Sequence, residues 1–338
     1  MATIGGLSEP RHISGGERDN TMTNAQLLKS RLHGAITALV TPFKDGDVDF
    51  AALERLIEWQ LSEGIDGLVV CGTTGEAPTL SWEERIAIIR RTVEVVGGKV
   101  PVIAGTGSND TRSTIAFTSA AASFGVDGVL IVTPYYNRPT QEGIFRHFEA
   151  VANSVELPII VYNVPSRTGV DLGLPTIRRL ADLRGVIGLK DATGDLSRPL
   201  GLTNLLGDDF LQLSGHDATA LGFCAAGGRG TISVISNIAP RLCVQMHEAY
   251  RKGDLHRAKS TSHQLRSLIT ALEMETNPAP AKYALHLLRG ISPEVRLPLV
   301  QVMPETASAI SDALRQLSAS TSECIVDRPM LRIAHDGG

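Results

Sequence analysis

A lysine at the end of an apolar run is the residue in this sequence best placed to do covalent chemistry. Residues 185–194 are GVIGLKDATG, so an apolar stretch leads directly into Lys190. A lysine drawn out of water has its charged form disfavoured, and its neutral amine can then attack a carbonyl carbon. The alternative is that Lys190 extends to the protein rim or pairs with Asp191, which requires no catalytic role.

Hydroxyl groups and an arginine follow other apolar runs. Thr73 and Thr74 lie in GTTGE, residues 72–76, where two hydroxyls and flexible backbone amides could receive a carboxylate. An ordinary turn is the alternative, because a capping box that begins at Ser81 starts a helix soon afterwards. Arg167, in NVPSRTG, could clamp a substrate carboxylate with its planar guanidinium, or could simply be solvated.

Other polar residues are open to structural explanations. Tyr135 and Tyr136 could belong to a site or could pack at a subunit contact. His216 and Asp217 favour the start of a helix over metal binding. The sequence has no HExxH motif and no Cys/His cluster, so we predict no metal site.

Eight short apolar runs alternate with longer amphipathic segments. Runs without polar alternation indicate strands covered on both faces, hence parallel strands under helices, and eight such units predict an α/β fold, a (β/α)8 TIM barrel. An open doubly wound sheet is the alternative. A repeated unit supports the barrel, because EGIDGLVV at 63–70 resembles FGVDGVLIV at 124–132. The apolar runs are residues 35–40, 66–71, 100–105, 127–132, 157–163, 185–190, 210–214 and 230–236.

The two ends of the chain lack the alternating apolar and amphipathic segments of the central region. We expect an N-terminal extension at residues 1–30, mixed in composition and flexible, with Met22 as a possible true start. The barrel should cover 31–238 and be closed by a helix that starts near 239. A C-terminal helical appendage at 255–318 and a tail at 319–338 complete the chain.

Composition and charge exclude several classes of protein. With 43% hydrophobic residues among 338, the chain can bury a large core. A net charge of −4 and scattered basic residues give no surface for nucleic acid or an anionic membrane. No apolar run approaches the roughly 20 residues of a membrane span. The four cysteines lack disulfide-like spacing, so we expect a cytoplasmic protein.

Six motifs occur in order along the chain: GTTGE (72–76), TPYYNRP (133–139), YNVPSRTG (162–169), GLKDATG (188–194), SGHDA (214–218) and GTISV (230–234). Together they resemble the dihydrodipicolinate synthase and N-acetylneuraminate lyase family of class I aldolases, over about residues 31–318. The resemblance implies that Lys190 forms a Schiff base with pyruvate, with no metal or other cofactor, and that the resulting enamine attacks an aldehyde.

The resemblance also implies roles for the residues around the lysine. Tyr162 is implied as the proton donor and acceptor, linked to Thr73 and to Tyr136, which in the family reaches in from a neighbouring subunit. We therefore expect at least a dimer, and the resemblance implies a tetramer, which is common in the family. The implied pyruvate carboxylate site consists of Thr74 with backbone groups at Gly215 and Ile232.

The resemblance further implies that Arg167 directs the choice of second substrate. In the family, the matching arginine of synthases binds the carboxylate of L-aspartate 4-semialdehyde, and GTTGE with PSRTG favours a synthase of diaminopimelate and lysine biosynthesis. Two alternatives stay open. One is a related pyruvate-dependent aldolase or dehydratase acting on a sugar acid or hydroxy-oxoglutarate, and the other is a non-catalytic barrel that binds a keto acid.

The expected allosteric pocket departs from the family pattern. Tyr135, Asn109 and Trp82 resemble residues of the lysine site in feedback-inhibited synthases. Arg85 and Ser113, however, stand where inhibited bacterial members often have a histidine and a glutamate. Loss of that acid removes a partner for the lysine amino group, so we predict weak or absent inhibition by lysine.

Overall fold

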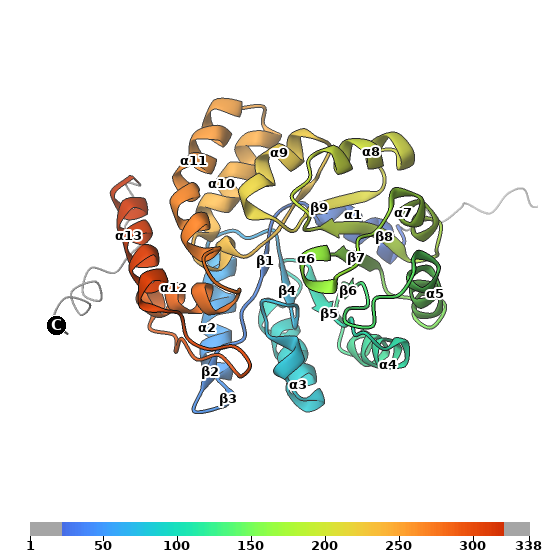
Figure 1. Ribbon diagram of the computed structural model, residues 1–338, viewed down its shortest axis with the longest axis horizontal. Helices are drawn as coiled ribbons and strands as arrows, with labels where there is room; N and C mark the ends of the chain where they lie inside the picture. The colour runs from blue at the N-terminus through green and yellow to red at the C-terminus, as the bar shows by residue number, and fades with distance from the viewer. Residues whose placement is uncertain (1–21, 321–338) are drawn as a thin grey trace, which may run out of the picture.

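The computed structural model describes residues 22–320 and contains a closed barrel of eight parallel strands (Figure 1). Going round the barrel, the order is β1-β10-β9-β8-β7-β6-β5-β4, so each strand lies beside the next one in the chain and β1 closes the ring. All eight predicted strands are present. Their bounds are β1 (Gly34–Ala38), β4 (Gly67–Val70), β5 (Val102–Gly105), β6 (Gly128–Val132), β7 (Ile159–Asn163), β8 (Val186–Asp191), β9 (Leu211–Ser214) and β10 (Gly230–Ser233). The predicted TIM barrel is therefore confirmed.

The apolar runs form these strands because both faces of each strand are buried. Along β7, Ile160 and Tyr162 belong to a cluster inside the barrel, whereas Ile159 and Val161 belong to the larger cluster between strands and helices. Side chains of a strand point alternately to its two faces, so a continuous apolar run serves two cores at once. The same alternation decides which polar residues at the strand ends face the barrel interior.

Helices surround the barrel (Figure 1). Their N-termini follow the predicted signals: Ser81 and Glu84 form the expected capping box of the helix that begins at Trp82. A small hairpin interrupts the pattern after β1, formed by β2 (Phe43–Lys44) and β3 (Asp47–Val48). The surrounding helices are α2 (Phe50–Ser62), α3 (Trp82–Val96), α4 (Thr111–Ala122), α5 (Gln141–Ala152), α7 (Leu174–Ala181), α8 (Ser197–Leu206), α9 (Ala220–Ala225) and α10 (Pro240–Arg251), and a one-turn helix, α6 (Pro165–Thr168), follows β7.

The repeated sequence unit has a common structural role. Gly64 and Gly125 each have a positive φ, 82° and 78°, shortly after the end of a helix. The aspartates that follow bind the neighbouring strand: Asp66 accepts a hydrogen bond from the Ala35 N–H, and Asp127 accepts one from the Val102 N–H, both at 2.8 Å. The repeat therefore ends a helix and sets the start of the adjacent strand in the same way twice.

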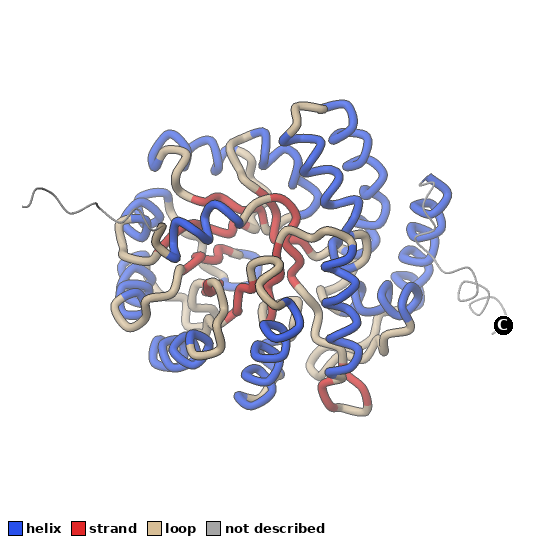
Figure 2. Tube along the Cα trace, turned by 180° about the vertical axis from the view of Figure 1, so that it is seen from behind, coloured by secondary structure: helices blue, strands red, loops and turns tan. Residues whose placement is uncertain are grey.

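The N-terminal boundary differs from the prediction. Residues 1–30 were expected to be a flexible extension, but residues 24–30 of that stretch belong to helix α1 (Asn24–Arg31), which lies across the strands on the face opposite to Figure 1 (Figure 2). Leu28 and Leu32 are 2% and 0% exposed and join the cluster inside the barrel. Removal of these two side chains from water explains why the segment is ordered. The rest of the expected extension, residues 1–21 with the tail from 321, lies outside the described residues.

The C-terminal region packs beside the barrel as helices α11 (Leu255–Leu272), α12 (Ala279–Arg289) and α13 (Pro304–Ser320). Helix α13 thus continues two residues into the expected tail, and a non-helical segment at 290–303 interrupts the helical region. Among the described residues, no helix is long and apolar enough to cross a membrane.

Candidate active site

Lys190 lies in a cavity of about 510 Å³ at the carboxyl ends of the strands. Its side chain comes from β8 and is only 7% exposed. The cavity walls come from several strand ends and from the C-terminal region: Ala38, Val69, Gly72, Thr73, Thr74, Leu130, Tyr162, Val164, Ser166, Arg167, Ala192, Gly215, His216, Val234 and residues 272–277 line it with Lys190. The lysine is thus inside the barrel mouth, and the alternative of an extended rim lysine is wrong.

Burial changes the acid–base behaviour of this lysine. The pKa of Lys190 is lowered to about 8, chiefly by the loss of hydration; Asp217 opposes this shift and the charge of Arg167 adds to it. An amine with this pKa has a substantial neutral fraction near neutral pH. Lys190 can therefore act as a nucleophile toward a carbonyl carbon without a separate base to deprotonate it.

Tyr162 is the closest aromatic neighbour of the lysine. It pairs with Lys190 in the β7–β8 register, and the Lys190 Nζ lies 4.2 Å from the centre of its ring. Burial raises the pKa of Tyr162, although Arg167 and a hydrogen bond with Thr73 oppose that shift. The phenol therefore stays neutral and protonated, and its hydroxyl can pass a proton to or from a reacting group.

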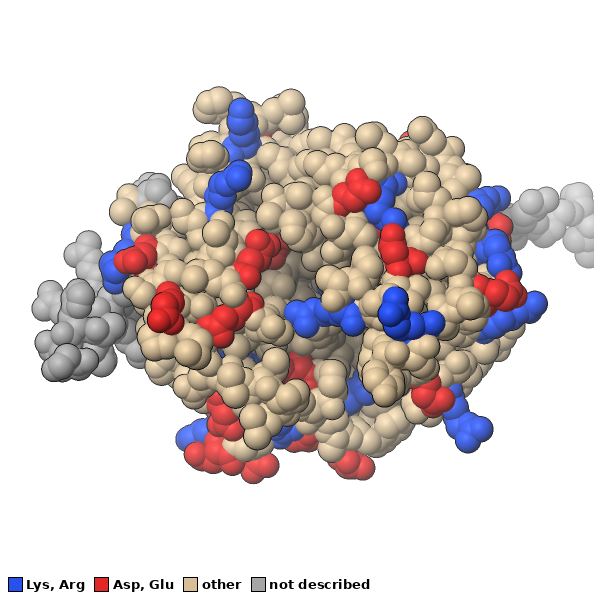
Figure 3. Space-filling model, viewed as in Figure 1, with Lys and Arg blue, Asp and Glu red and all other residues tan. Residues whose placement is uncertain are grey.

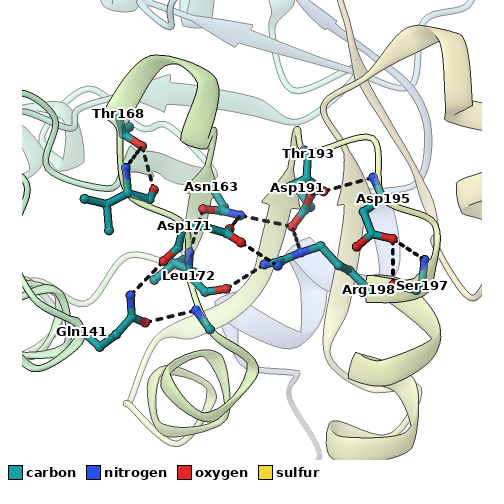
Figure 4. Close-up of polar contacts among 12 residues, drawn as sticks. Gln141, Asn163, Thr168, Asp171, Leu172, Asp191, Thr193, Asp195, Ser197 and Arg198 are labelled. Atoms are coloured by element: carbon teal, nitrogen blue, oxygen red, sulfur yellow. Dashed lines mark hydrogen bonds and ion pairs between the residues drawn. The ribbon is translucent and has the colours of Figure 1, made fainter.

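Asp191 does not line the cavity. A polar cluster between β7, β8 and α8 holds its carboxylate instead (Figure 4). The Arg198 Nε donates to Asp191 Oδ2 at 2.9 Å, and the Thr193 N–H donates to Asp191 Oδ1 at 2.9 Å. Asn163 donates to the same carboxylate and to Asp171. Asp191 is 2% exposed, so it has its own partners and does not neutralise Lys190.

Gly215 allows the lysine to reach its position. A Cβ at Gly215 would lie 2.8 Å from the Lys190 Cε and 2.8 Å from the Ala192 Cβ, closer than side-chain carbons pack. The Gly215 N–H donates to the Asp191 carbonyl at 2.6 Å, so this N–H is already used. The role of Gly215 is to leave space beside the Lys190 side chain.

Both charge signs occur around the mouth of the cavity. Figure 3 shows a hollow near the centre of the face seen in Figure 1, with basic and acidic side chains at its edges. Arg167, on α6, lines one part of the wall, and Glu273 and Glu275 line the part that comes from the C-terminal region. The site can thus receive a substrate that carries a carboxylate.

Comparison with known proteins adds to this geometry. The model of the dihydrodipicolinate synthetase family matches residues 31–317, which is most of the chain. The chain belongs to that family. A 4-hydroxy-tetrahydrodipicolinate synthase of Acidiphilium cryptum is 52% identical to it over 286 residues, covering 84% of this chain and 98% of the relative.

Solved structures of the dihydrodipicolinate synthetase family have the same fold. One is described as the first monomeric dihydrodipicolinate synthase variant; it is 42% identical, with a TM-score of 0.84 and coverage of 86% of this chain and 98% of its own. Another, a chloride-inhibited dihydrodipicolinate synthase from Acinetobacter baumannii complexed with pyruvate, is 43% identical, with a TM-score of 0.83 and coverage of 85% and 99%.

The structure gathers most, but not all, of the residues predicted for the site. Lys190, Tyr162, Thr73, Thr74, Arg167 and Gly215 line the cavity together. Ile232 does not line it: this residue is 1% exposed in β10, and Val234 reaches the cavity in its place. Tyr136 is also outside the cavity of its own chain, with 87% of its side chain exposed and a φ of 69°.

The residues of the expected allosteric pocket are dispersed. Tyr135 and Arg85 line a second cavity of about 400 Å³, which shares Thr73, Tyr162 and Arg167 with the first. Trp82 instead lines a groove on α3, and its ring packs edge-on against Phe117 with a centroid distance of 4.8 Å. Asn109 lines neither cavity; its carbonyl accepts a hydrogen bond from Asn137. Within one described chain, the three predicted residues therefore do not form one pocket.

The contribution of the C-terminal region to the site is missing from the sequence prediction. Residues 272–277, at the end of α11 and in the loop before α12, line the first cavity, and the Asn277 Nδ2 donates to the Thr74 Oγ1 at 2.9 Å. The sequence carried no periodic signal for this contact because the two residues are 203 positions apart. Within residues 22–320, no group of three His, Cys, Asp or Glu side chains is placed to hold a metal ion.

Proposed function

We propose that the protein condenses pyruvate with L-aspartate 4-semialdehyde to give 4-hydroxy-tetrahydrodipicolinate, in diaminopimelate and lysine biosynthesis in the cytoplasm. The observation that carries this proposal is Lys190, buried in the barrel mouth with a pKa lowered to about 8, beside the ring of Tyr162. The names of the family relatives support the same reaction, as does the relative that is complexed with pyruvate.

The reaction begins with attack of the Lys190 amine on the keto carbon of pyruvate. Loss of water gives an imine, and loss of a methyl proton gives an enamine. The enamine carbon attacks the aldehyde carbon of the second substrate, whose oxygen takes up a proton. The substrate's own amino group then attacks the imine carbon and releases Lys190, which closes the ring. No metal or other cofactor takes part.

Tyr162 moves the protons of these steps, with Thr73 as its hydrogen-bond partner. A hydroxyl relay suits this task because it transfers protons without leaving a fixed charge beside the amine. Tyr136 of a second copy completes the relay, so the active unit is at least a dimer and, by family habit, a tetramer. The 87% exposure of this side chain in one chain supports that arrangement.

Substrate carboxylates bind at two places. Thr74, 3% exposed on the loop after β4, receives the carboxylate of pyruvate, and Arg167 at the wall receives that of aspartate semialdehyde. Lysine inhibits weakly or not at all, because Ser113 stands where inhibited members often have a glutamate, and the lysine amino group lacks that partner here. Lysine at millimolar concentration should lower the initial rate only slightly or not at all, and inhibition at micromolar concentration would contradict this expectation.

Borohydride trapping tests the covalent step. Incubation with pyruvate and borohydride should add one reduced pyruvate, mapped by mass to the peptide that contains Lys190, and Lys190→Met should abolish it. If the wild-type protein binds pyruvate but is not labelled, the protein is a keto-acid-binding barrel and the proposal fails.

A comparison of aldehydes tests the second substrate. Initial rates with pyruvate and either aspartate semialdehyde or sugar-derived aldehydes should favour aspartate semialdehyde. Arg167→Ala should raise the KM for aspartate semialdehyde at least tenfold, whereas Arg178→Ala on the outer surface should not. Undiminished efficiency of Arg167→Ala with aspartate semialdehyde would favour a related aldolase or dehydratase instead.

A further inference from the structure

The proposed pyruvate subsite has a partner in the C-terminal appendage. The Asn277 Nδ2 donates a hydrogen bond of 2.9 Å to the Thr74 Oγ1, and both residues line the cavity that holds Lys190. Asn277 precedes α12, whereas Thr74 follows β4 on the far side of the sequence. The contact thus joins the C-terminal appendage to the loop after β4, at the place where the carboxylate of pyruvate is expected to bind.

The direction of this hydrogen bond decides what the Thr74 hydroxyl can do. A threonine hydroxyl has one proton to donate and two lone pairs that accept. Because Asn277 occupies a lone pair, the Thr74 proton points away from the amide. Thr74 makes no other side-chain hydrogen bond within the described chain, so its proton is available to the cavity. A carboxylate accepts such a proton in a strong, charge-assisted hydrogen bond.

We propose that Asn277 is a positioning residue: it orients the Thr74 hydroxyl as a donor to the carboxylate of pyruvate. This inference rests on the proposed function, since it needs pyruvate in this cavity. Asn277 acts through Thr74 and not on the reacting carbon. The C-terminal appendage is therefore part of the pyruvate subsite.

The appendage is fixed firmly enough to perform this role. Two residues after Thr74, Glu76 is buried and forms an ion pair of 2.5 Å with Lys282 on α12, and neither side chain is more than 1% exposed. The Glu76 Oε2 also accepts a hydrogen bond from the Arg296 N–H. These contacts hold α12, which follows Asn277 directly, against the loop of Thr74.

The other atom of the Asn277 amide points to a functional constraint. Its Oδ1 is buried and has no hydrogen-bond partner. A buried acceptor without a partner destabilises the folded state, whereas an apolar group of similar shape does not. An asparagine kept only for stability would be a poor choice here. Replacement by leucine should leave the thermal stability unchanged or raised while it weakens pyruvate binding.

Steady-state kinetics of the full-length protein test the proposal with Asn277→Leu and Asn277→Asp. We expect Asn277→Leu to raise the KM for pyruvate about three- to tenfold, with kcat and the KM for aspartate semialdehyde within twofold of wild type. Asn277→Asp should raise the pyruvate KM more than tenfold, because a carboxylate draws the Thr74 proton to itself and repels the substrate. Asn153→Asp, an exposed position after α5, is the matched control and should change neither KM.

A double-variant cycle separates positioning from general damage. In a Thr74→Val background, Asn277→Leu should raise the pyruvate KM by less than twofold further, because the hydroxyl through which it acts is gone. An undiminished effect in that background, an equal rise in both KM values, or an unchanged pyruvate KM in Asn277→Leu would each overturn the proposal. Borohydride trapping of the wild-type protein distinguishes failure of this proposal from failure of the proposed function. If Lys190 is labelled but Asn277→Leu has the pyruvate KM of the wild type, only the positioning role is refuted. If the wild-type protein is not labelled, the proposed function is refuted.

Discussion

The titration of Lys190 is the most direct consequence of its burial. With the pKa lowered from 10.5 to about 8, roughly one lysine in ten is neutral at pH 7, against about one in 3,000 for an ordinary lysine. The free amine is therefore about 300 times more abundant than in water. This factor comes chiefly from the loss of hydration at a side chain that is 7% exposed.

Competitive trace labelling with acetic anhydride measures this pKa, since only neutral amines react. The Lys190 peptide is quantified by mass spectrometry between pH 6 and pH 10.5, with the 73%-exposed Lys252 as the internal reference. We expect labelling of Lys190 to rise tenfold per pH unit below about pH 8 and then to level off. Arg167→Ala should move this midpoint to higher pH, because it removes a positive charge that lowers the pKa.

A midpoint near pH 10 would refute the reasoning, because it would mean that the lysine is hydrated in the folded protein. An unchanged midpoint in Arg167→Ala would show that Arg167 does not act on the amine electrostatically. With a midpoint near pH 10, the amine would need another route to deprotonation.

Three further predictions concern stability, each measured by urea denaturation at one fixed protein concentration. Lys190→Met should stabilise the protein by about 1–3 kcal/mol at pH 7. The pKa of Lys190 is lower in the folded than in the unfolded state, so between about pH 8 and 10.5 the unfolded chain binds a proton that the folded protein has lost. The stability of the wild-type protein therefore rises with pH in that window, and the advantage of the methionine variant becomes smaller. Lys282→Met should destabilise the folded protein by about 3–5 kcal/mol because it leaves Glu76 buried without its partner. The additional substitution Glu76→Gln should recover part of that loss. Equal stability of Lys282→Met and wild type would contradict the buried ion pair. Leu28→Ala should cost about 2–4 kcal/mol, and Leu27→Ala, 45% exposed on the same helix, well under 1 kcal/mol; similar values for the two would mean that α1 does not seal the barrel.

The sequence by itself determined the barrel and the centre of the site. Continuous apolar runs without polar alternation specify strands buried on both faces, and eight of them with helices between leave little but a closed barrel. In that fold the carboxyl ends of the strands meet, so Lys190, Tyr162, Thr73 and Arg167 could be placed together from their positions at or shortly after the ends of apolar runs. Their individual roles came from the resemblance to the family. The lowered pKa of Lys190 follows from the same placement.

Only the tertiary structure showed that the C-terminal appendage completes the wall of the site and that α1 covers one end of the barrel. Asn277 reaches Thr74 across 203 positions, and helix α1 packs Leu28 under the barrel although its sequence carries no amphipathic pattern that predicted this. Local patterns report which residues are buried along one element, but not which distant elements bury them. Such contacts depend on how the appendage and α1 pack against a finished barrel, and no short stretch of the chain encodes that.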